Sequence, residues 1–431
     1  MPGEAATQSL MISATRSVSL QKLRLPGETF VLEFPNVDRS TLPYIHHFVN
    51  FCCRFIAYYN DNQANPFYEE LVPFATTSPA LLHSMVALAA GHLSRVHPGH
   101  GSTAAKHYAL AVHELNTTLS SPAVARSTST LGACLLLCVF EISRSDRKVW
   151  YKHLQGARDL IMYQGGPRSS SFLTRFFALL DVSGSLFAGR GPLLPGNYWV
   201  EDMSSRTKAS GQSAKRAWPH YDAGNVMVDH FHELMTYMVQ ISSLSFESLA
   251  EAKRDSSFAI QEKACKIRDE ILAWWETCPT ELKDQEIDWR TKSGKLSAAQ
   301  RLEKEAFAST RTCVLGCVLY LNHIVDPLGI PTAKHSVASA IQEILAHVVA
   351  TPENAGLEMG LFYGLFTVGV ALYKDPEREA LVRRRLGSDM KVSLYHAKGP
   401  LELLELVWEK QHKHNKRFDW RKVQEEMGGY V

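Results

Sequence analysis

The chain has 431 residues, of which 45% are hydrophobic and 21% are charged. This composition is typical of a folded globular protein and excludes a disordered or fibrous one. The formal net charge at pH 7 is only +2, whereas a protein that binds nucleic acid by itself usually carries a basic excess, because neutralising phosphates supplies much of the affinity. No apolar run is long enough to cross a bilayer and the N-terminus shows no signal peptide, so neither a membrane protein nor a secreted one is expected.

In chain order, residues 1–40 are predicted to be a disordered N-terminal tail, because their first half is rich in Ser, Thr and Ala. Helical patterns begin at about residue 43. A clear one follows Ser78, a residue suited to the N-cap, and Pro79, which suits the first helical position. Leu81, Met85 and Leu88 then recur at helical spacing, which predicts a helix with one buried face.

A second strong pattern begins at Trp150. Leu154, Ala157 and Ile161 follow it at the spacing of one helix face. The run Gly165-Gly166-Pro167 ends the pattern, because glycine often closes a helix and proline does not continue one. The sequence therefore predicts a helix that begins at about Trp150 and is stopped by Gly165.

The rest of the chain also favours helices, and no segment shows a convincing strand pattern. Since no Pro/Gly-rich linker divides it, the predicted fold is all-α: a single large multi-helix array of packed antiparallel helices over residues 41–431. A flexible loop is expected at 204–217, where Ser, Gly and four basic residues replace apolar ones. Further helices are expected at 43–59, 103–119, 128–142, 172–187, 226–249, 258–277, 298–325, 336–349, 356–372 and 400–412.

The cysteines give no zinc-binding pattern. The chain contains no Cys-x-x-Cys, and its first two cysteines, Cys52 and Cys53, are adjacent. The pairs Cys134/Cys138 and Cys313/Cys317 are each four residues apart, so either pair could face one metal ion or form a disulfide. Their Leu, Val and Ala neighbours favour buried, reduced cysteines that pack as small apolar residues.

Two groups of histidines are candidates for metal binding. Neither matches His-Glu-x-x-His, in which two ligands one helical turn apart face one zinc ion. In the second group the two histidines are two residues apart and point in different directions on a helix. Both groups are therefore interpreted as surface or core histidines. They are His92, His97, His100 and His107 in the first group, and His230 and His232 beside Glu233 in the second.

The sequence motifs of common catalytic and nucleotide-binding sites are absent or lie in the wrong structural context. The segment 99–104 fits a loose Gly-x-Gly-x-x-Ala pattern, but a dinucleotide site needs a strand before it, and here a helix is expected. The chain has neither a Gly-x-Ser-x-Gly elbow nor a phosphate-binding Gly-x4-Gly-Lys-Ser/Thr loop. The sequence thus predicts no enzyme, no cofactor, and no catalytic, cofactor-binding or metal-binding residue.

Two regions of the chain carry a resemblance to a known family. The first region comprises the blocks 65–67, 78–95, 109–111, 138–141 and 150–166, and the second the blocks 361–369, 383–386, 403–408 and 419–420. In their order and spacing these blocks resemble the regulatory domain of the fungal zinc-cluster transcription factors. The resemblance implies an all-α regulator of transcription in the nucleus, but the six closely spaced cysteines of the family's DNA-binding module do not occur in the sequence.

Three functional hypotheses follow from this resemblance. In the first, the chain regulates transcription without binding DNA itself, through other transcription regulators or self-association, with an unidentified small-molecule effector as a further ligand. In the second, the sequence is a truncated gene model and an upstream exon encodes the zinc cluster. In the third, the chain is a helical ligand-binding or scaffold protein that has no role in transcription.

Overall fold

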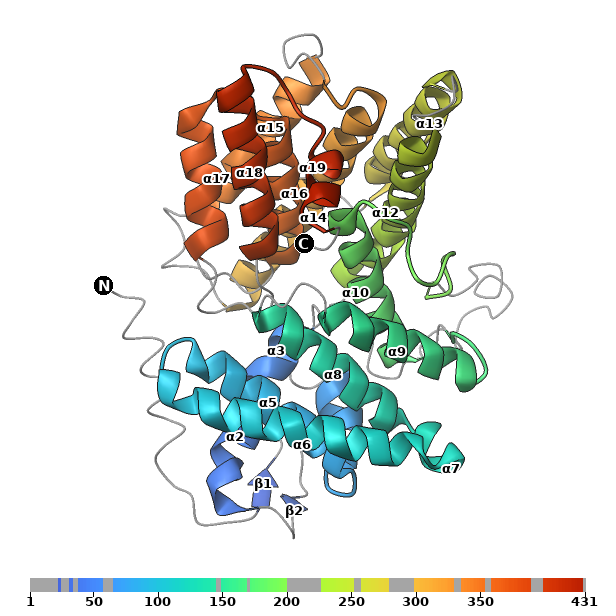
Figure 1. Cartoon of the computed structure of the whole chain (residues 1–431), viewed down its shortest axis with the longest axis vertical. Helices are drawn as coiled ribbons and strands as arrows, with labels where there is room; N and C mark the ends of the chain where they lie inside the picture. Colours follow the sequence, from blue (N-terminus) through green and yellow to red (C-terminus); the bar gives the residue numbers. More distant parts are fainter. Residues whose placement is uncertain are drawn as a thin grey trace. The chain divides into compact units, whose positions relative to one another are not determined.

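The structure is a computed structural model in which the chain forms two compact units, unit 1 (Met1–Gly166) and unit 2 (Pro167–Val431) (Figure 1). Each unit is described by itself. The described residues are 22–24, 31–33, 38–56, 65–144, 149–168, 171–199, 226–251, 257–278, 298–328, 335–352, 358–388 and 398–428.

Unit 1 is built mainly from helices. Helix α5 packs against both α6 and α8, and α8 packs against α9. The α-helices are α2 (Leu42–His47), α3 (Cys53–Ile56), α4 (Val72–Phe74), α5 (Pro79–Ser94), α6 (Gly101–Leu119), α7 (Pro122–Ala125), α8 (Thr128–Arg144) and α9 (Val149–Tyr163). Short 3-10 turns lie at Arg39–Thr41 and Pro98–His100, and π-helical turns at Phe48–Cys52 and Phe67–Leu71.

The start of α5 follows from its sequence. Ser78 has an extended backbone, and its hydroxyl accepts a hydrogen bond from the amide of Leu81 at 3.5 Å, while Pro79 occupies the first helical turn. The helix is buried along most of its length and packs tightly on α8. A Cβ atom on Gly91 would lie 2.9 Å from the ring of Phe140, so the two helices can approach this closely only because position 91 has no side chain.

One pair of short strands departs from the predicted all-α class. β1 (Lys22–Arg24) pairs antiparallel with β2 (Val31–Glu33), so that Leu23 lies opposite Leu32. Each strand has three residues, which is too short for an alternating pattern to be recognised in a sequence. The pair lies within the predicted N-terminal tail, and the rest of residues 1–37 lies outside the described part of the chain.

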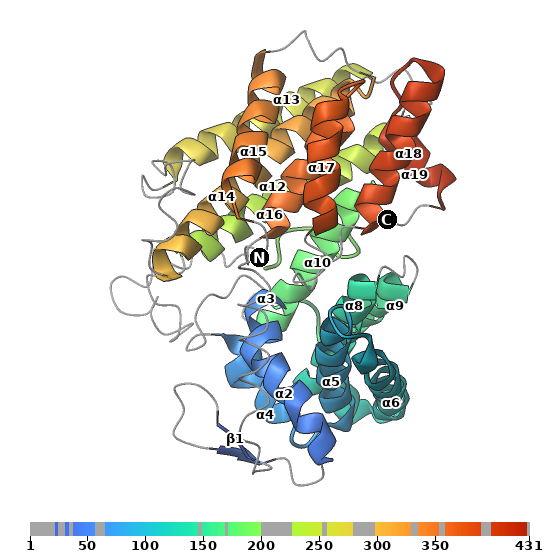
Figure 2. The ribbon, with the colours of Figure 1, turned by 90° about the vertical axis from the view of Figure 1, so that its left-hand side faces the viewer.

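Unit 2 is arranged around α14, which packs against α12, α13, α15 and α16. Helix α16 also packs against α15, α17 and α18, and Figure 2 shows α15, α16 and α17 side by side. The helices are α10 (Phe172–Ala188), α12 (Val226–Glu251), α13 (Ser257–Thr277), α14 (Ala298–Val325), α15 (His335–Ala350), α16 (Glu358–Ala371), α17 (Pro376–Ser388), α18 (Lys398–His414) and α19 (Trp420–Glu426).

The contact between α14 and α16 depends on glycine. An added Cβ on Gly360 would lie 2.1 Å from the backbone oxygen of Ser309, and one on Gly364 would lie 2.8 Å from that of Thr312. Real Cβ contacts are never this short, so neither position can take a side chain without moving a helix. The Ser309 hydroxyl also accepts a hydrogen bond from the amide of Gly360 at 3.1 Å, which pairs an amide that the first turn of α16 leaves free.

The predicted all-α class is confirmed for the described residues, apart from β1 and β2. The helix predicted at 43–59 is interrupted by the π-helical turn Phe48–Cys52. Helices α17 and α19 were not predicted. The loop expected at 204–217, with Arg206, Lys208, Lys215 and Arg216, lies outside the described residues. That residues 41–431 form a single domain remains a prediction.

Candidate functional site

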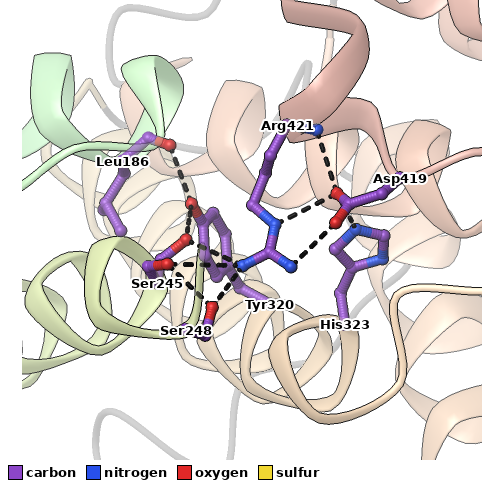
Figure 3. Close-up of polar contacts among 7 residues, drawn as sticks. All are labelled: Leu186, Ser245, Ser248, Tyr320, His323, Asp419 and Arg421. Atoms are coloured by element: carbon purple, nitrogen blue, oxygen red, sulfur yellow. Dashed lines mark hydrogen bonds and ion pairs between the residues drawn. The ribbon is translucent and has the colours of Figure 1, made fainter. Parts of the chain in front are cut away.

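A buried group of polar side chains joins the last helix, α19, to the rest of unit 2 (Figure 3). Asp419 is the N-cap of α19, and its carboxylate accepts a hydrogen bond from the amide of Arg421 at 3.0 Å. The Arg421 guanidinium also binds this carboxylate, with Nε 3.0 Å from Oδ1 and Nη2 2.9 Å from Oδ2. Both residues are almost fully buried, so the pair lies out of contact with water.

The remaining nitrogen of Arg421, Nη1, points toward α12. It donates to the hydroxyl of Ser248 at 2.7 Å and to that of Ser245 at 3.3 Å. The Ser248 hydroxyl in turn donates to the backbone oxygen of Ser245 at 2.7 Å. The two serines lie one helical turn apart on α12 and so face the guanidinium together.

Helix α14 contributes Tyr320 and His323 to the same group. The Tyr320 hydroxyl donates to the backbone oxygen of Leu186 at 3.1 Å and lies 3.2 Å from the hydroxyl of Ser245. Burial raises the pKa of Tyr320 to about 12, so the phenol keeps its proton at neutral pH. His323 Nε2 lies 3.4 Å from the Asp419 carboxylate.

The charges on this group are set by its burial and its hydrogen bonds. Burial lowers the pKa of His323, and the nearby Asp419 opposes this only in part. Burial alone would raise the pKa of Asp419, but the hydrogen bonds from His323 and Arg421 outweigh it and hold the pKa well below its usual range. The carboxylate therefore stays ionised opposite Arg421.

Apolar and amide contacts complete the docking of α19. The ring of Trp420 meets those of Tyr320 and Phe366 edge to face, with centroids 5.7 and 5.1 Å apart. The side-chain amide of Gln424 donates to the backbone oxygen of Phe187 at 2.6 Å. This oxygen lies at the end of α10, which Gly189 closes with a left-handed backbone, φ +61°. We call Asp419, Arg421, Ser245, Ser248, Tyr320 and His323 the α19 network.

The α19 network holds a helix in place rather than activating a reactant. Its carboxylate is already bound by Arg421 and His323, and its tyrosine has a raised pKa, so neither is prepared as a base or nucleophile. Asp419 lies in the block 419–420, one of those in which the chain resembles the fungal regulatory domain. Ser245, Ser248, Tyr320 and Arg421 had no such signal, because Arg421 and Ser248 lie 173 positions apart in the sequence.

The histidines singled out in the sequence do not gather around one point. Nδ1 of His92 lies 3.0 Å from Nε2 of His47. Nδ1 of His107 lies 3.1 Å from Nδ1 of His83. His100 bonds instead with the hydroxyl of Tyr44. His97 is exposed. Three members of the run therefore pair with residues from elsewhere in unit 1, and these partners could not be read from the sequence.

The histidine pairs make unit 1 sensitive to acid. Burial and the neighbouring imidazole lower the pKa of His47 to about 3 and of His107 to about 4, from an ordinary value of 6.5. Since the folded-state pKa is the lower one, the pairs stabilise the fold fully above pH 6.5, and this contribution falls as the pH drops from 6.5 toward 4.

We expect the free energy of unfolding, measured in urea, to be about 1–2 kcal/mol lower at pH 5 than at pH 7.5 for each such histidine. Tryptophan fluorescence, with Trp150 as the probe in unit 1, measures this. His107→Gln should reduce the pH dependence by roughly one proton, while His97→Gln, at an exposed position, should leave it unchanged. An equal pH dependence in wild type and His107→Gln would show that the pair does not control acid stability.

His230, His232 and Glu233 also fail to converge. Nδ1 of His230 lies 3.3 Å from the Glu233 carboxylate, which also accepts a hydrogen bond from the indole of Trp274 at 2.9 Å. His232 takes part through its backbone oxygen, which accepts from the indole of Trp199 at 3.1 Å. Among the described residues, no three His, Cys, Asp or Glu side chains are placed so that they could hold a metal ion together.

Comparison with known families identifies the chain. A model of the fungal-specific transcription factor domain matches residues 43–431. The chain belongs to this family. Comparisons with curated proteins and with solved structures gave no match. None of the described helices is both long and apolar enough to cross a membrane.

Three residues from the blocks that carry the family resemblance, Cys138, Trp150 and His153, lie at helix contacts in unit 1. The thiol of Cys138 donates to the backbone oxygen of Trp150 at 3.4 Å, and the thiol of the nearby Cys134 donates to the backbone oxygen of His153 at 3.2 Å, so α8 is tied to α9. The ring of His153 bonds with the Tyr108 hydroxyl on α6 at 3.1 Å. These contacts join three helices, as expected for packing residues.

The cysteines are buried thiols, with the exception of Cys265, which is partly exposed. Burial raises the pKa of Cys134 to about 12, so its thiol is protonated and weakly reactive. Cys313 lies beside Cys317 and 3.8 Å from the sulfur of Met238. This agrees with the packing interpretation of the two pairs, while the expected absence of a metal remains a prediction.

The loose dinucleotide pattern at 99–104 lies on helical backbone. It spans the end of the 3-10 turn Pro98–His100 and the beginning of α6, and the element before it is α5, not a strand. A dinucleotide site needs a strand that ends at the glycines, with the phosphates bound at the following helix. The pattern is therefore a chance match.

Proposed function

We propose that this fungal-specific transcription factor domain regulates transcription in the nucleus by binding other regulators or a second copy of itself, without binding DNA on its own. The observation that carries the proposal is the family match, which extends over residues 43–431. The near balance of 46 basic and 44 acidic residues supports the proposed lack of DNA binding by the chain alone, because it leaves little excess charge for phosphate binding.

The geometry favours a binding role over an enzymatic one. The most extensive buried polar group that we describe, the α19 network, has its charged groups paired and serves to fasten a helix. We therefore propose no catalytic activity. A full factor in which a zinc cluster encoded upstream is joined to this domain remains the alternative, and there the same domain would regulate a DNA-binding module of its own chain.

Chromatin immunoprecipitation of the tagged chain, combined with mobility-shift assays of the purified chain on the recovered sites, tests the proposal. We expect promoter occupancy in cells and no sequence-selective shift by the purified chain. Gly360→Ala, which forces α14 and α16 apart, should reduce the occupancy, whereas Gly387→Ala, with no atom within 4 Å of the new Cβ, should preserve it.

Each contrary outcome has a definite meaning. Tight, sequence-selective binding by the purified chain would show that it reads DNA itself. Cytosolic localisation with no promoter occupancy would favour the third hypothesis, a helical ligand-binding or scaffold protein. Wild-type occupancy by a Gly360→Ala variant whose unit 2 is shown by thermal unfolding to be largely unfolded at the growth temperature would show that this unit is not the part that contacts the partner.

A further inference from the structure

Helix α19 is short and lies after a change in chain direction. It has seven residues, and a helix of this length is not stable in water on its own. It is separated from α18 by a turn that begins near Asn415, whose φ of +55° is left-handed. The helical form of α19 therefore depends on its docking onto the other helices of unit 2.

The contacts that dock α19 combine two buried apolar side chains with a set of specific polar bonds. Two apolar side chains, Trp420 and Val423, are buried to 1% exposure. The polar contacts include hydrogen bonds from Arg421 to the serines of α12 and the approach of His323 to Asp419 (Figure 3). Gln424 donates to the last turn of α10, and Lys410 of α18 pairs with Glu426 at the surface. The ion pair of Arg421 with Asp419 lies within the docked segment itself. A buried ion pair adds little net stability, since removing two charges from water offsets most of their attraction.

The same contacts allow no intermediate position. Asp419 and Arg421 are satisfied together only when Ser245, Ser248 and His323 are all in place. If α19 shifted by one turn, the Asp419–Arg421 pair would move with it but would lose the hydrogen bonds to Ser245, Ser248 and His323, and a buried ion pair without such hydrogen bonds is unfavourable. Helix α19 is thus either fully docked or fully undocked.

We propose that α19 is a C-terminal latch, which undocks and redocks as a unit while α10, α12 and α14 stay folded. Undocking uncovers the serines of α12 and the rings of Tyr320 and Phe366, a mixed polar and aromatic surface that the docked helix covers. The latch gives unit 2 two states, one in which the surface under α19 is covered and one in which it is exposed. The latch does not depend on the proposed role in transcription.

Hydrogen exchange of the full-length chain, followed by mass spectrometry, tests the latch. The informative amides are those of Val423 and Met427, which are hydrogen-bonded only within the docked segment. We expect them to exchange faster than the amides of α14 and α16, through an opening that costs less free energy than global unfolding. Arg421→Ala should speed their exchange by about 100-fold or more, because it leaves the Asp419 carboxylate buried without its main partner.

Lys422→Ala is the matched control, since Lys422 is an exposed residue in the same helix. It should leave the exchange of α19 unchanged. Ser248→Ala removes one hydrogen bond from the guanidinium and should speed exchange about 5-fold; this variant also serves if Arg421→Ala does not fold.

Two results would overturn the proposal. One is exchange of the wild-type Val423 and Met427 amides at the rate of the α14 core, which would mean that α19 opens only when unit 2 unfolds. The other is an equal acceleration in α14, α16 and α19 when Arg421 or Ser248 is replaced. Either result would make α19 an integral part of the core.

Discussion

Replacing Gly360 with alanine is expected to lower the free energy of unfolding of unit 2 by about 3 kcal/mol or more. The new Cβ would lie 2.1 Å from the backbone oxygen of Ser309, and this atom belongs to α14 and has no flexible end that could move aside. Helix α16 must therefore shift outward along with the residues packed on it. In a thermal unfolding experiment the midpoint should fall by roughly 6–12 °C.

Gly387→Ala is the matched control for this experiment. Gly387 lies in helix α17, and nothing lies within 4 Å of an added Cβ. Alanine favours a helix over glycine by about 0.5–1 kcal/mol, so the same chemical change should stabilise the protein slightly here. Equal and small effects at positions 360 and 387 would contradict the close approach of α14 and α16.

Trp408→Ala is expected to destabilise unit 2 by about 3–5 kcal/mol, because it leaves a large cavity between helices. Trp408 is buried on α18, and its indole donates to the backbone oxygen of Gly369 on α16 at 2.9 Å. The guanidinium of Arg383, on α17, lies over the ring at 5.4 Å. One side chain thus joins three helices, and urea unfolding measures its contribution.

Two further variants separate the parts of this effect. Trp408→Phe keeps most of the ring volume and loses the hydrogen bond to Gly369, so it should cost only about 1–2 kcal/mol. Lys413→Ala, at an exposed position of the same helix, should change stability by about 0.5 kcal/mol at most. A loss in Trp408→Ala no larger than that in Lys413→Ala would show that α18 is not held through this residue.

The sequence predicts helices best where local chemistry marks both ends. Ser78 and Pro79 correctly predicted the beginning of α5. The segment predicted at 172–187 ends within one residue of the end of α10, because Gly189 supplies the left-handed backbone that stops this helix. Helix α17 was missed because it carries many charges and only a few buried apolar residues. Helix α19 was missed because seven residues are too few for a periodic pattern.

The candidate site was much harder to predict than the helices. Its key bonds join residues that are far apart in sequence, such as Arg421 with Ser248 and Gln424 with Phe187, and no local pattern encodes such a pairing. The interpretation of the clustered histidines as surface or core residues agrees with the described structure, because His92 and His107 bond with different partners on other parts of unit 1. The identity of those partners, His47 and His83, has no local signal in the sequence.

The uneven burial of the cysteines has a practical consequence. Cys265, on α13, is partly exposed, while the other cysteines of the chain are buried. Burial also raises the pKa of the Cys134 thiol. Thiol reagents react with accessible thiolates, so a maleimide dye or a spin label would attach to the folded protein at Cys265 first. The native chain therefore already carries a single reporter position on unit 2, with no need to remove other thiols by mutation.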